Sequence, residues 1–526
     1  MSFTSLTFAV FLGIMLLGYY LIPKKAQWVW LLLGSYVFYA WSSPYLALFL
    51  LFSTATTWLF PLVMGRLSDR QQEWLASEQG QALTKDEKKA YKKKVQRQKR
   101  WLLVLCLICN IGLLAFLKYT NFAIDTINRF GAELPALDWL VLPLGISFYT
   151  FQSVGYVIDV YRETALPQKN FLKYALYVSF FPQICQGPIG RYNDLAPQLY
   201  AGHRFDYDGF VMGLERILLG FFKKMVIADQ IAVYVDAVYQ NASAYSGVIL
   251  GLATLMYAFQ LYADFSGYMD IAIGTGRCFG IRLAENFETP YFSRSITEFW
   301  RRWHITLGSW FKDYLYYPVL RSGWCSGIGK RLSKKGRKKA AKTLTTVIGL
   351  AITWLLIGMW HGASWNFILY GCYHGAFVIL AVVLGDVYEK LKQRLHIREG
   401  NKLWQGFQIV RTFAIVTFGY VLFRSADISQ AALIYKRLLT VFSPAGHSLS
   451  GLMAGDFNKI KWIMIAALLL LCFIMELIGS KKEIISWLRE RRRIVRWLFL
   501  YALAALILLF ANWNASGAGN FIYFNF

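Results

Sequence analysis

The sequence is poor in charged side chains and rich in apolar ones. Of its 526 residues, 16% are charged and 56% belong to the apolar set AVILMFWYC. A water-soluble domain carries about 25% charged residues and at most about half apolar residues. This shortage of charge excludes a disordered chain, a fibrous repeat protein and an ordinary cytosolic enzyme. It predicts a polytopic membrane protein.

Acidic residues are scarcer still, at 30 against 56 Lys and Arg, so the formal net charge is +26. In a soluble protein, an excess of this size would indicate nucleic-acid binding. Here most basic residues fall in four segments between apolar stretches, at 66–100, 321–342, 386–411 and 481–496. Such segments are typical of cytoplasmic loops, which can also meet anionic lipid. We therefore expect the lipid bilayer as a partner and no nucleic acid.

Cysteines are few, and the common catalytic motifs are missing. The seven cysteines are irregularly spaced, and Cys106 and Cys109 form a CxxC pair in an apolar run without a nearby histidine or second pair. This pattern gives no disulfide framework and favours buried thiols over a zinc or redox site. The sequence contains no P-loop, G-x-S-x-G or H-E-x-x-H pattern. We expect neither a metal ion nor a bound cofactor.

Apolar stretches long enough to cross a bilayer as helices run through the whole chain. The predicted spans are 5–22, 28–42, 45–64, 101–118, 139–160, 246–265, 343–360, 364–384, 405–424, 462–479 and 497–513. Residues 171–185 and 209–235 are further apolar segments. The first runs into Pro and Gly residues, and we expect the stretch 171–192 to be re-entrant. No internal repeat or Pro-rich linker is visible, so we expect a single all-α membrane domain over residues 1–526.

The basic segments predict an orientation. With 66–100 inside the cell, the alternation of spans puts the N-terminus outside. With 481–496 inside, the last span puts the C-terminal tail, 514–526, outside as well. Two consecutive spans between basic loops must form a hairpin, and its tip, near Trp360 and His361, then points outward.

Two stretches place a histidine among apolar residues, where ionisable groups are functional candidates. In 298–318, EFWRRWHITLGSWFKDYLYYP, aromatic spacing predicts a helix lying at the membrane surface with His304 on its buried face. His304 is then either a structural or a functional histidine. In 358–375, GMWHGASWNFILYGCYHG, glycines predict a helix break beside His361. A neutral imidazole there is suited to taking a proton from a hydroxyl, and helix packing is the alternative.

Other ionisable residues interrupt the apolar pattern further upstream. Asp264 and Asp270 are six residues apart, so we expect them to serve different partners. They either pair with a nearby Arg or His or mark the ion path of a transporter. Arg191 follows the sequence QGPIG and either binds an anionic group of a carrier-bound substrate or pairs with Asp194 or a carbonyl.

Together these stretches resemble the membrane-bound O-acyltransferase (MBOAT) family, and within it the bacterial alginate O-acetylation branch. The resemblance rests on FPQICQGPIGRYNDLAPQL, LYADFSGYMDIAIGTG, NFETPYFSRSITEFWRRWHITLGSWFKDYLYYP and GMWHGASWNFILYGCYHG, within about residues 140–375. It implies a ring of about eleven or more transmembrane helices, with re-entrant segments, around a central tunnel. The flanking transmembrane regions are then 1–118 and 405–513.

The resemblance also implies an activity and its site. His361 is expected to be the catalytic histidine and His304 a second, supporting one. An acyl thioester, either acetyl-CoA or an acyl carrier protein, would donate from the cytoplasmic side of a bacterial cell membrane. An exoplasmic acyltransferase or acceptor protein would complete O-acetylation of a cell-surface glycan. The residues expected to line or support the tunnel are Asp264, Asp270, Arg191, Arg302, Asp313, Asn366 and Trp360.

Two alternatives stay open at this point. The same fold could transfer D-alanine to teichoic acid. A protein of another class, an ion-coupled transporter, could use Asp264 and Asp270 as an ion path. Transporters often show repeated halves, and none is visible here.

The chain ends in FIYFNF, whose apolar residues are expected to return the tail to the membrane. The one side-chain hydroxyl in these six residues belongs to Tyr523. The tail resembles that of the small membrane partner in D-alanylation systems, where a tyrosine is thought to carry the acyl group. Tyr523 is therefore either a transient acyl carrier or an aromatic anchor at the membrane interface.

Overall fold

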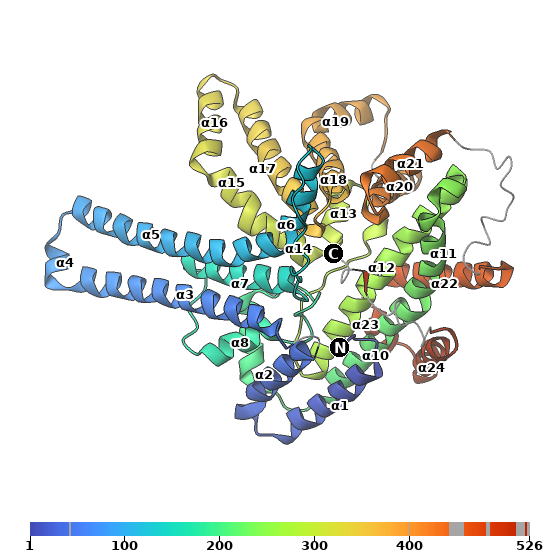
Figure 1. Cartoon of the computed structure of the whole chain (residues 1–526), viewed down its shortest axis with the longest axis horizontal. Coiled ribbons are helices and arrows are strands. Elements are labelled where there is room, and N and C mark those ends of the chain that lie inside the picture. Colours follow the sequence, from blue (N-terminus) through green and yellow to red (C-terminus); the bar gives the residue numbers. More distant parts are fainter. Residues whose placement is uncertain (42–43, 399, 441–456, 480–483, 512–520, 523–526) are drawn as a thin grey trace. The chain divides into compact units, whose positions relative to one another are not determined.

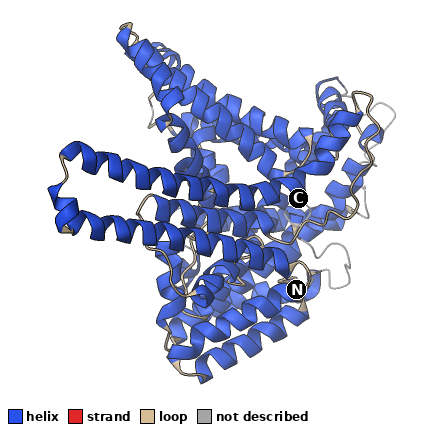
Figure 2. Cartoon of the chain, turned by 60° about the vertical axis from the view of Figure 1, so that its left-hand side comes forward, coloured by secondary structure: helices blue, strands red, loops and turns tan. Residues whose placement is uncertain are grey.

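A computed structural model of the chain describes all residues except 42–43, 399, 441–456, 480–483, 512–520 and 523–526. In the described part, the regular structure is helical, apart from one isolated β-bridge between Phe287 and Trp303 (Figures 1 and 2). The chain divides into two compact units. The first comprises 1–213 and 275–284, and the second comprises 214–274 and 285–526.

The first unit holds the N-terminal helices. They are α1 (Leu6–Leu21), α2 (Lys24–Ala40), α3 (Ala47–Ala76), α4 (Glu78–Ala82), α5 (Lys85–Leu107), η1 (Ile108–Gly112), α6 (Leu113–Asn128), α7 (Ile146–Tyr161), α8 (Phe171–Ser179), α9 (Tyr192–Ala201) and the start of α10 (Tyr207–Phe221). The π-helical turn η1 joins α5 and α6 into one continuous helix of 44 residues.

Helices α3 and α5 form a long antiparallel hairpin with α4 at its tip (Figures 1 and 2). The hairpin carries the basic segment 66–100. Helix α5 begins where Thr84 and Glu87 form a capping box, each side chain accepting the other residue's backbone N–H, at 3.3 and 2.9 Å. Farther along α5, away from the hairpin tip, the buried Lys99 ammonium lies 2.6 Å from the Glu163 carboxylate.

The segment predicted to be re-entrant forms the short helix α8 and then a buried loop over 180–189. The loop packs directly on Gly145, where φ is +71° and an added Cβ would lie 2.3 Å from the Ile184 carbonyl oxygen. Inside the loop, the Gln183 side chain donates to the Gln152 amide oxygen at 3.0 Å. The predicted break in the helix is therefore present, whereas re-entry into a membrane stays a prediction.

The second unit holds the remaining helices. They are the end of α10, η2 (Phe222–Ala228), α11 (Asp229–Gln240), η3 (Ala242–Ala244), α12 (Gly247–Cys278, up to residue 274), η4 (Pro290–Phe292), α13 (Ile296–Arg302), α14 (Ile305–Phe311), η5 (Lys312–Tyr316), α15 (Tyr317–Arg321), α16 (Gly323–Lys334), α17 (Lys338–His361), α18 (Trp365–Val383), α19 (Gly385–Arg394), α20 (Lys402–Arg424), α21 (Ile428–Thr440), α22 (Lys459–Gly479), α23 (Ile484–Arg489) and α24 (Arg493–Phe510).

Eight helices in the described part are long and apolar enough to cross a membrane. They are Ala47–Ala76, Lys85–Asn128, Gly247–Cys278, Lys338–His361, Trp365–Val383, Lys402–Arg424, Lys459–Gly479 and Arg493–Phe510. The other three predicted spans coincide with the shorter helices α1, α2 and α7. The prediction of an all-α membrane protein is confirmed, and a ring of eleven or more spanning helices stays a prediction.

Two predicted span boundaries were wrong. Helix α7 begins at Ile146 instead of residue 139, because Pro143 disfavours helix before it and Gly145 has a positive φ. Helix α12 runs on to Cys278 instead of ending at residue 265, because the carboxylates in its path have cationic partners. A paired carboxylate does not end a buried helix.

The predicted single helix over 298–318 was also wrong. Helix α13 ends at Arg302, α14 begins at Ile305, and the chain between them is not helical. His304 has φ 48°, in the left-handed region, and Trp303 is extended and bridged to Phe287. The periodicity of aromatic residues cannot predict this break, because the break depends on pairing with residues 286–288 of the preceding loop.

Candidate functional site

The first predicted histidine lies at the break between α13 and α14. The preceding loop pairs with this break: the Glu288 N–H donates to the Arg302 carbonyl at 3.0 Å, and the Ile305 N–H donates to the Asn286 carbonyl at 3.1 Å. A left-handed conformation at a residue other than glycine costs free energy and persists only where its surroundings enforce it. The strained backbone of His304 therefore marks this break as a candidate functional position.

The His304 side chain is held in a dry environment. It is 2% exposed, Phe265 meets its ring edge-on with centroids 4.8 Å apart, and its Nδ1 lies 3.4 Å from Asn286 Oδ1. Burial lowers the pKa of His304 to about 3. The imidazole is therefore neutral near pH 7, a state in which one ring nitrogen donates a hydrogen bond and the other can accept one.

The second predicted histidine ends helix α17. His361 is followed by Gly362 in an extended conformation, and α18 begins at Trp365. The two helices pack closely where an added Cβ on Gly371 would lie 2.4 Å from the Trp354 carbonyl oxygen. The predicted hairpin with a glycine break beside His361 is therefore present.

His361 is 4% exposed, and aromatic rings surround it. Its ring centroid lies 4.9 Å from that of Trp360, 5.2 Å from that of Phe423 and 5.7 Å from that of Tyr370. Trp360 also faces His304, with ring centroids 5.8 Å apart. The structure thus brings both predicted histidines to one indole, although they come from segments far apart in the sequence.

A cavity of about 430 Å³ opens beside the first histidine. Its lining includes His304 and the indoles of Trp300, Trp303 and Trp354, with Arg301 also on its wall. This volume lies within the range of small-ligand sites. An aromatic wall with few charged groups suits a neutral, partly apolar ligand portion.

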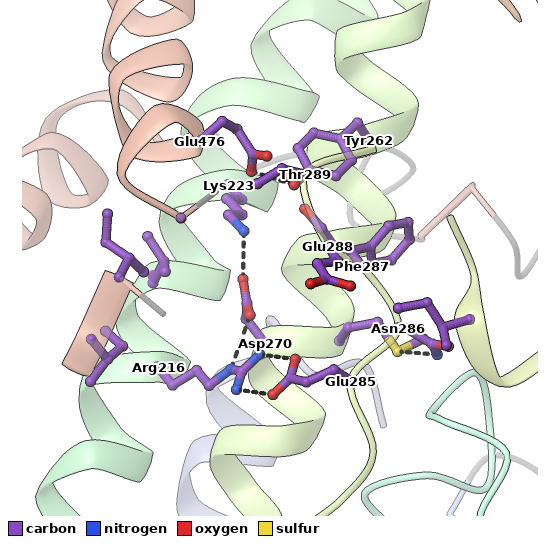
Figure 3. A pocket seen from close by; sticks show the side chains of 17 residues that line it. Arg216, Lys223, Tyr262, Asp270, Glu285, Asn286, Phe287, Glu288, Thr289 and Glu476 are labelled. Carbon is purple, nitrogen blue, oxygen red and sulfur yellow. Dashed lines mark hydrogen bonds and ion pairs between the residues drawn. The ribbon is translucent and has the colours of Figure 1, made fainter. Parts of the chain in front are cut away.

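A second cavity of about 590 Å³ is strongly charged (Figure 3). At its centre, the Asp270 carboxylate accepts from Arg216 Nε at 3.1 Å and lies 2.8 Å from Lys223 Nζ. Arg216 also makes a bidentate pair with Glu285, at 2.6 and 2.5 Å. On the opposite wall, the Tyr262 hydroxyl donates to Glu476 (Figure 3).

The segment that carries the histidine break contributes to the lining of both cavities. Ile305 lines both of them, and Asn286 lines the charged one. His304 lines the aromatic cavity and is next in sequence to a residue that lines both.

The two predicted aspartates serve different partners, as expected. Asp270 belongs to the charged cavity, whereas Asp264 pairs with Lys224 at 2.7 Å. Lys224 Nζ also lies 2.9 Å from Asp229. Asp270 pairs with an arginine, as one interpretation predicted, and also with a lysine, whereas Asp264 pairs with a lysine instead of the predicted Arg or His. Separate cationic partners support the pairing interpretation over a shared ion path.

The remaining predicted residues are more scattered. Arg302 is half-buried, pairs with Glu298 at 2.7 Å and does not line either cavity. Asn366 ties the start of α18 to the end of α20 by donating to the carbonyls of Ser425 and Leu422, at 2.8 and 3.3 Å. Its role in the described contacts is structural.

Two further predicted residues are not part of the histidine cluster, and a third cannot be compared with it. Asp313 is half-buried in the π-helical turn η5. Arg191 lies in the first unit, at the N-cap of α9, where its carbonyl accepts from Asp194 N–H at 3.2 Å. Tyr523 lies outside the described residues.

Several site residues were missed at the sequence level. Lys223 and Lys224 interrupt the apolar run 209–235, and the cost of buried charge could have identified them. Glu476 likewise lies near the end of a predicted span. Nothing in the sequence pattern identified Asn286 as a site residue. Its loop contacts the break at His304 only in the folded chain.

Comparison with known proteins identifies related sequences. Residues 164–423 match the profile of MBOAT, the membrane-bound O-acyltransferase family. This stretch includes both histidines and both aspartates.

Three relatives illustrate the range of similarity. The probable alginate O-acetylase AlgI of Azotobacter vinelandii is 34% identical over 489 residues, covering 92% of this chain and 85% of that protein. The peptidoglycan O-acetyltransferase of Helicobacter pylori is 30% identical over 564 residues, covering 99% and 97%. The teichoic acid D-alanyltransferase of Bacillus subtilis is 32% identical over 295 residues, covering 54% and 69%.

Proposed function

This chain belongs to the membrane-bound O-acyltransferase family, and we propose that it moves an acetyl group from a cytoplasmic thioester across the membrane for O-acetylation of a cell-surface polysaccharide. Membrane-bound acyl transfer is the activity of the family. The acetyl group and the polysaccharide rest on the two relatives named for O-acetyl transfer, which match this chain over 92% and 99% of its length.

The observation that carries the chemistry is the pair of buried histidines that share Trp360. His361 acts as the general base: it takes the proton of an acceptor hydroxyl as that oxygen attacks the thioester carbonyl. The carbon–sulfur bond then breaks, and the imidazolium returns the proton to the leaving thiolate. No net proton is gained or lost.

His304 acts as the supporting histidine. Its low pKa keeps it neutral through the cycle, so it can hold a reacting group by a hydrogen bond without adding charge to a dry site. The strained conformation of its backbone, maintained by the Asn286 segment, fits a group that must be held in one place.

The aromatic cavity beside His304 suits the donor. A thioester arm built from amides and methylenes is neutral and flexible, and the indole walls offer apolar contact. Arg301 and Lys312 also line this cavity and can meet the phosphate of such a donor. The donor is therefore acetyl-CoA or an acetylated carrier protein.

The orientation follows from the basic segments. The hairpin 66–100 and the segment 481–496 lie in the cytoplasm, so the N-terminus and the C-terminal tail are exoplasmic. The donor then arrives from the cytoplasm, and a separate exoplasmic acyltransferase or acceptor protein receives the acetyl group and delivers it to the glycan.

Tyr523 is the proposed first acceptor. The two residues before it, Phe521 and Ile522, contact the interior of the second unit, which supports this role. His361 would deprotonate the Tyr523 hydroxyl, the phenolate oxygen would attack the thioester, and the resulting ester would pass to the exoplasmic acceptor. The alternative role of Tyr523 is an interfacial anchor.

D-alanyl transfer to teichoic acid is the second candidate. The specific observation in its favour is the 32% identity to the Bacillus subtilis enzyme, which covers 54% of this chain. The relatives named for O-acetyl transfer match a larger share of this chain, and this favours an acetyl group over a D-alanyl group.

A donor assay with the purified full-length protein in lipid nanodiscs tests this proposal. Acetyl-CoA, acetylated carrier protein and D-alanylated carrier protein, each isotope-labelled in the acyl group, are supplied separately. We expect label from one of the acetyl donors to reach the protein or an added polysaccharide. Label from the D-alanyl donor alone would overturn the acetyl assignment, and no label from any donor would overturn the transfer mechanism.

A further inference from the structure

Two residues of the C-terminal tail are seated inside the second unit. Phe521 is fully buried, and Tyr268 meets its ring edge-on with centroids 4.8 Å apart. The next residue, Ile522, donates its backbone N–H to Asp264 Oδ2 at 3.0 Å. The tail is therefore fixed by an aromatic side chain and by a backbone hydrogen bond to a carboxylate.

The surroundings of this contact are charged. Lys224 Nζ lies 2.7 Å from Asp264 Oδ1 and 2.9 Å from Asp229, and it also lies 4.7 Å from the centroid of the Phe521 ring. One ammonium thus holds two carboxylates and faces the tail's aromatic ring, a cation–π contact. The three charged side chains are largely buried, with exposed fractions of 2%, 12% and 2% for Lys224, Asp229 and Asp264.

Burying three charges is expensive, and apolar side chains of similar size would often stabilise a fold as well or better. Buried ionic groups are best attested where they specify one arrangement among several. Here that arrangement includes the tail, because one oxygen of Asp264 pairs with Lys224 and the other accepts from Ile522. Lys224 lies in the π-helical turn η2, a type of irregularity that is frequent at functional sites.

We propose that Lys224, Asp229, Asp264 and Tyr268 form a binding site, the tail socket, for the apolar C-terminal end of this same chain. Phe521 is the anchor, and Asp264 fixes the register of the tail by holding the Ile522 N–H. The socket thereby fixes the chain at Phe521 and Ile522. Its role in catalysis rests on the proposed function of Tyr523 as acyl carrier. Its role as a binding site is independent of the function of Tyr523.

The first test is chemical labelling of Ile522→Cys, which keeps the backbone N–H and the Phe521 anchor. The full-length protein in nanodiscs is treated with N-ethylmaleimide, and mass spectrometry measures the modification at residue 522. We expect slow labelling, and labelling about tenfold faster or more when Asp264→Ala is added, since a hydrogen bond to a charged group is lost.

The matched control is Asp236→Ala. Asp236 also pairs with a cation of the second unit, Arg424, but it does not contact the socket. We expect it to leave labelling at residue 522 slow. Labelling that is equally fast with and without Asp264→Ala would overturn the socket.

A second test avoids changing the buried charges, because Asp264 variants could fail to fold. Ile522→Pro removes the backbone N–H that donates to Asp264, whereas Ile522→Val keeps it. We expect acyl transfer to be about tenfold or more lower in the proline variant than in the valine variant. Equal activity of the two variants would overturn the positioning role.

A double-mutant cycle completes the test. If Ile522→Pro and Asp264→Asn remove the same hydrogen bond, their combination should lose little more transfer activity than the stronger single variant. Fully additive losses would contradict a direct contact.

The two proposals fail in different ways. If Tyr523→Phe transfers normally while labelling at residue 522 still depends on Asp264, the carrier is wrong and the socket stands. If Tyr523→Phe abolishes transfer but Ile522→Cys is labelled fast with Asp264 unchanged, the carrier role of Tyr523 is supported and the proposed socket is wrong.

Discussion

Asn286 holds Thr306 by two hydrogen bonds: its side-chain oxygen accepts the Thr306 backbone N–H at 2.9 Å and the Thr306 hydroxyl at 2.8 Å. Asn286 is fully buried, and Thr306 stands at the first turn of α14. This contact ties the loop that contains Asn286 to the first turn of α14, which begins directly after His304. It explains how His304 keeps a left-handed conformation that costs free energy on its own.

The first prediction concerns this contact. Asn286→Ala should lower the free energy of unfolding by about 1–3 kcal/mol, because it leaves buried donors of Thr306 unsatisfied. Acyl transfer should fall about tenfold or more, since His304 is no longer held. Thermal unfolding in detergent and the donor assay measure the two effects.

Asn401→Ala is the matched control for this variant. Asn401 also accepts backbone N–H groups, as the N-cap of α20, but it is exposed and lies away from the histidines. It should cost about 1 kcal/mol of stability and leave transfer unchanged. Equal loss of transfer in both variants would show that Asn286 acts through stability alone.

The second prediction concerns pH. The folded pKa of His304 is about 3 and its unfolded pKa is near 6.5, so the unfolded state binds a proton first on acidification. The stability that this difference contributes is complete above pH 6.5 and is lost as pH falls toward 3. The unfolding temperature of the wild type should therefore drop over this window, and His304→Gln should drop less steeply.

His396→Asn serves as the control for the pH series. His396 is exposed and has a positive φ, which asparagine tolerates. Its unfolding temperature should follow the wild-type curve. A His304→Gln curve parallel to wild type would contradict a neutral buried His304.

The third prediction concerns the faces of the membrane. In intact cells, a membrane-impermeant thiol reagent should modify Ala518→Cys and spare Ala90→Cys, because the proposed orientation puts the basic hairpin in the cytoplasm and the tail outside. Permeabilised cells should expose both positions. The opposite pattern in intact cells would invert the orientation and separate the tail from the acceptor side.

The fourth prediction concerns the acyl carrier. Tyr523→Phe removes a hydroxyl and keeps nearly all apolar contact, so it should abolish acyl transfer without reducing the amount of protein in the membrane. Tyr501→Phe, on the exposed face of α24, removes a hydroxyl elsewhere and should transfer normally. Full transfer by Tyr523→Phe would leave only the anchor role.

Much of the fold could be predicted from the sequence, because length and hydropathy define helices that must satisfy their own backbone in lipid. The α17–α18 hairpin is an example: its apolar spans, glycine break and buried His361 all follow from local pattern. The break at His304 did not follow, because it depends on pairing with Asn286 and Phe287, and periodicity carries no information on such contacts.

The candidate site was predictable to a similar degree. His304, His361 and Trp360 stood out as polar or aromatic residues in apolar stretches, and the structure brings their rings together. Separate partners for Asp264 and Asp270 also followed from their spacing. Which cation meets which carboxylate did not, because Lys223 and Lys224 are adjacent in sequence and yet hold different aspartates.

The fifth prediction tests the central claim most directly: the acetyl content of the envelope polysaccharide, measured by mass spectrometry in cells that express the wild type, His361→Ala or His396→Ala as their only copy of this protein. Loss of a general base slows transfer by about 10²–10⁴-fold. The account predicts an acetylated polymer with the wild type and with His396→Ala, and an unacetylated polymer with His361→Ala present in the membrane at normal amount. Normal acetylation with His361→Ala would contradict it.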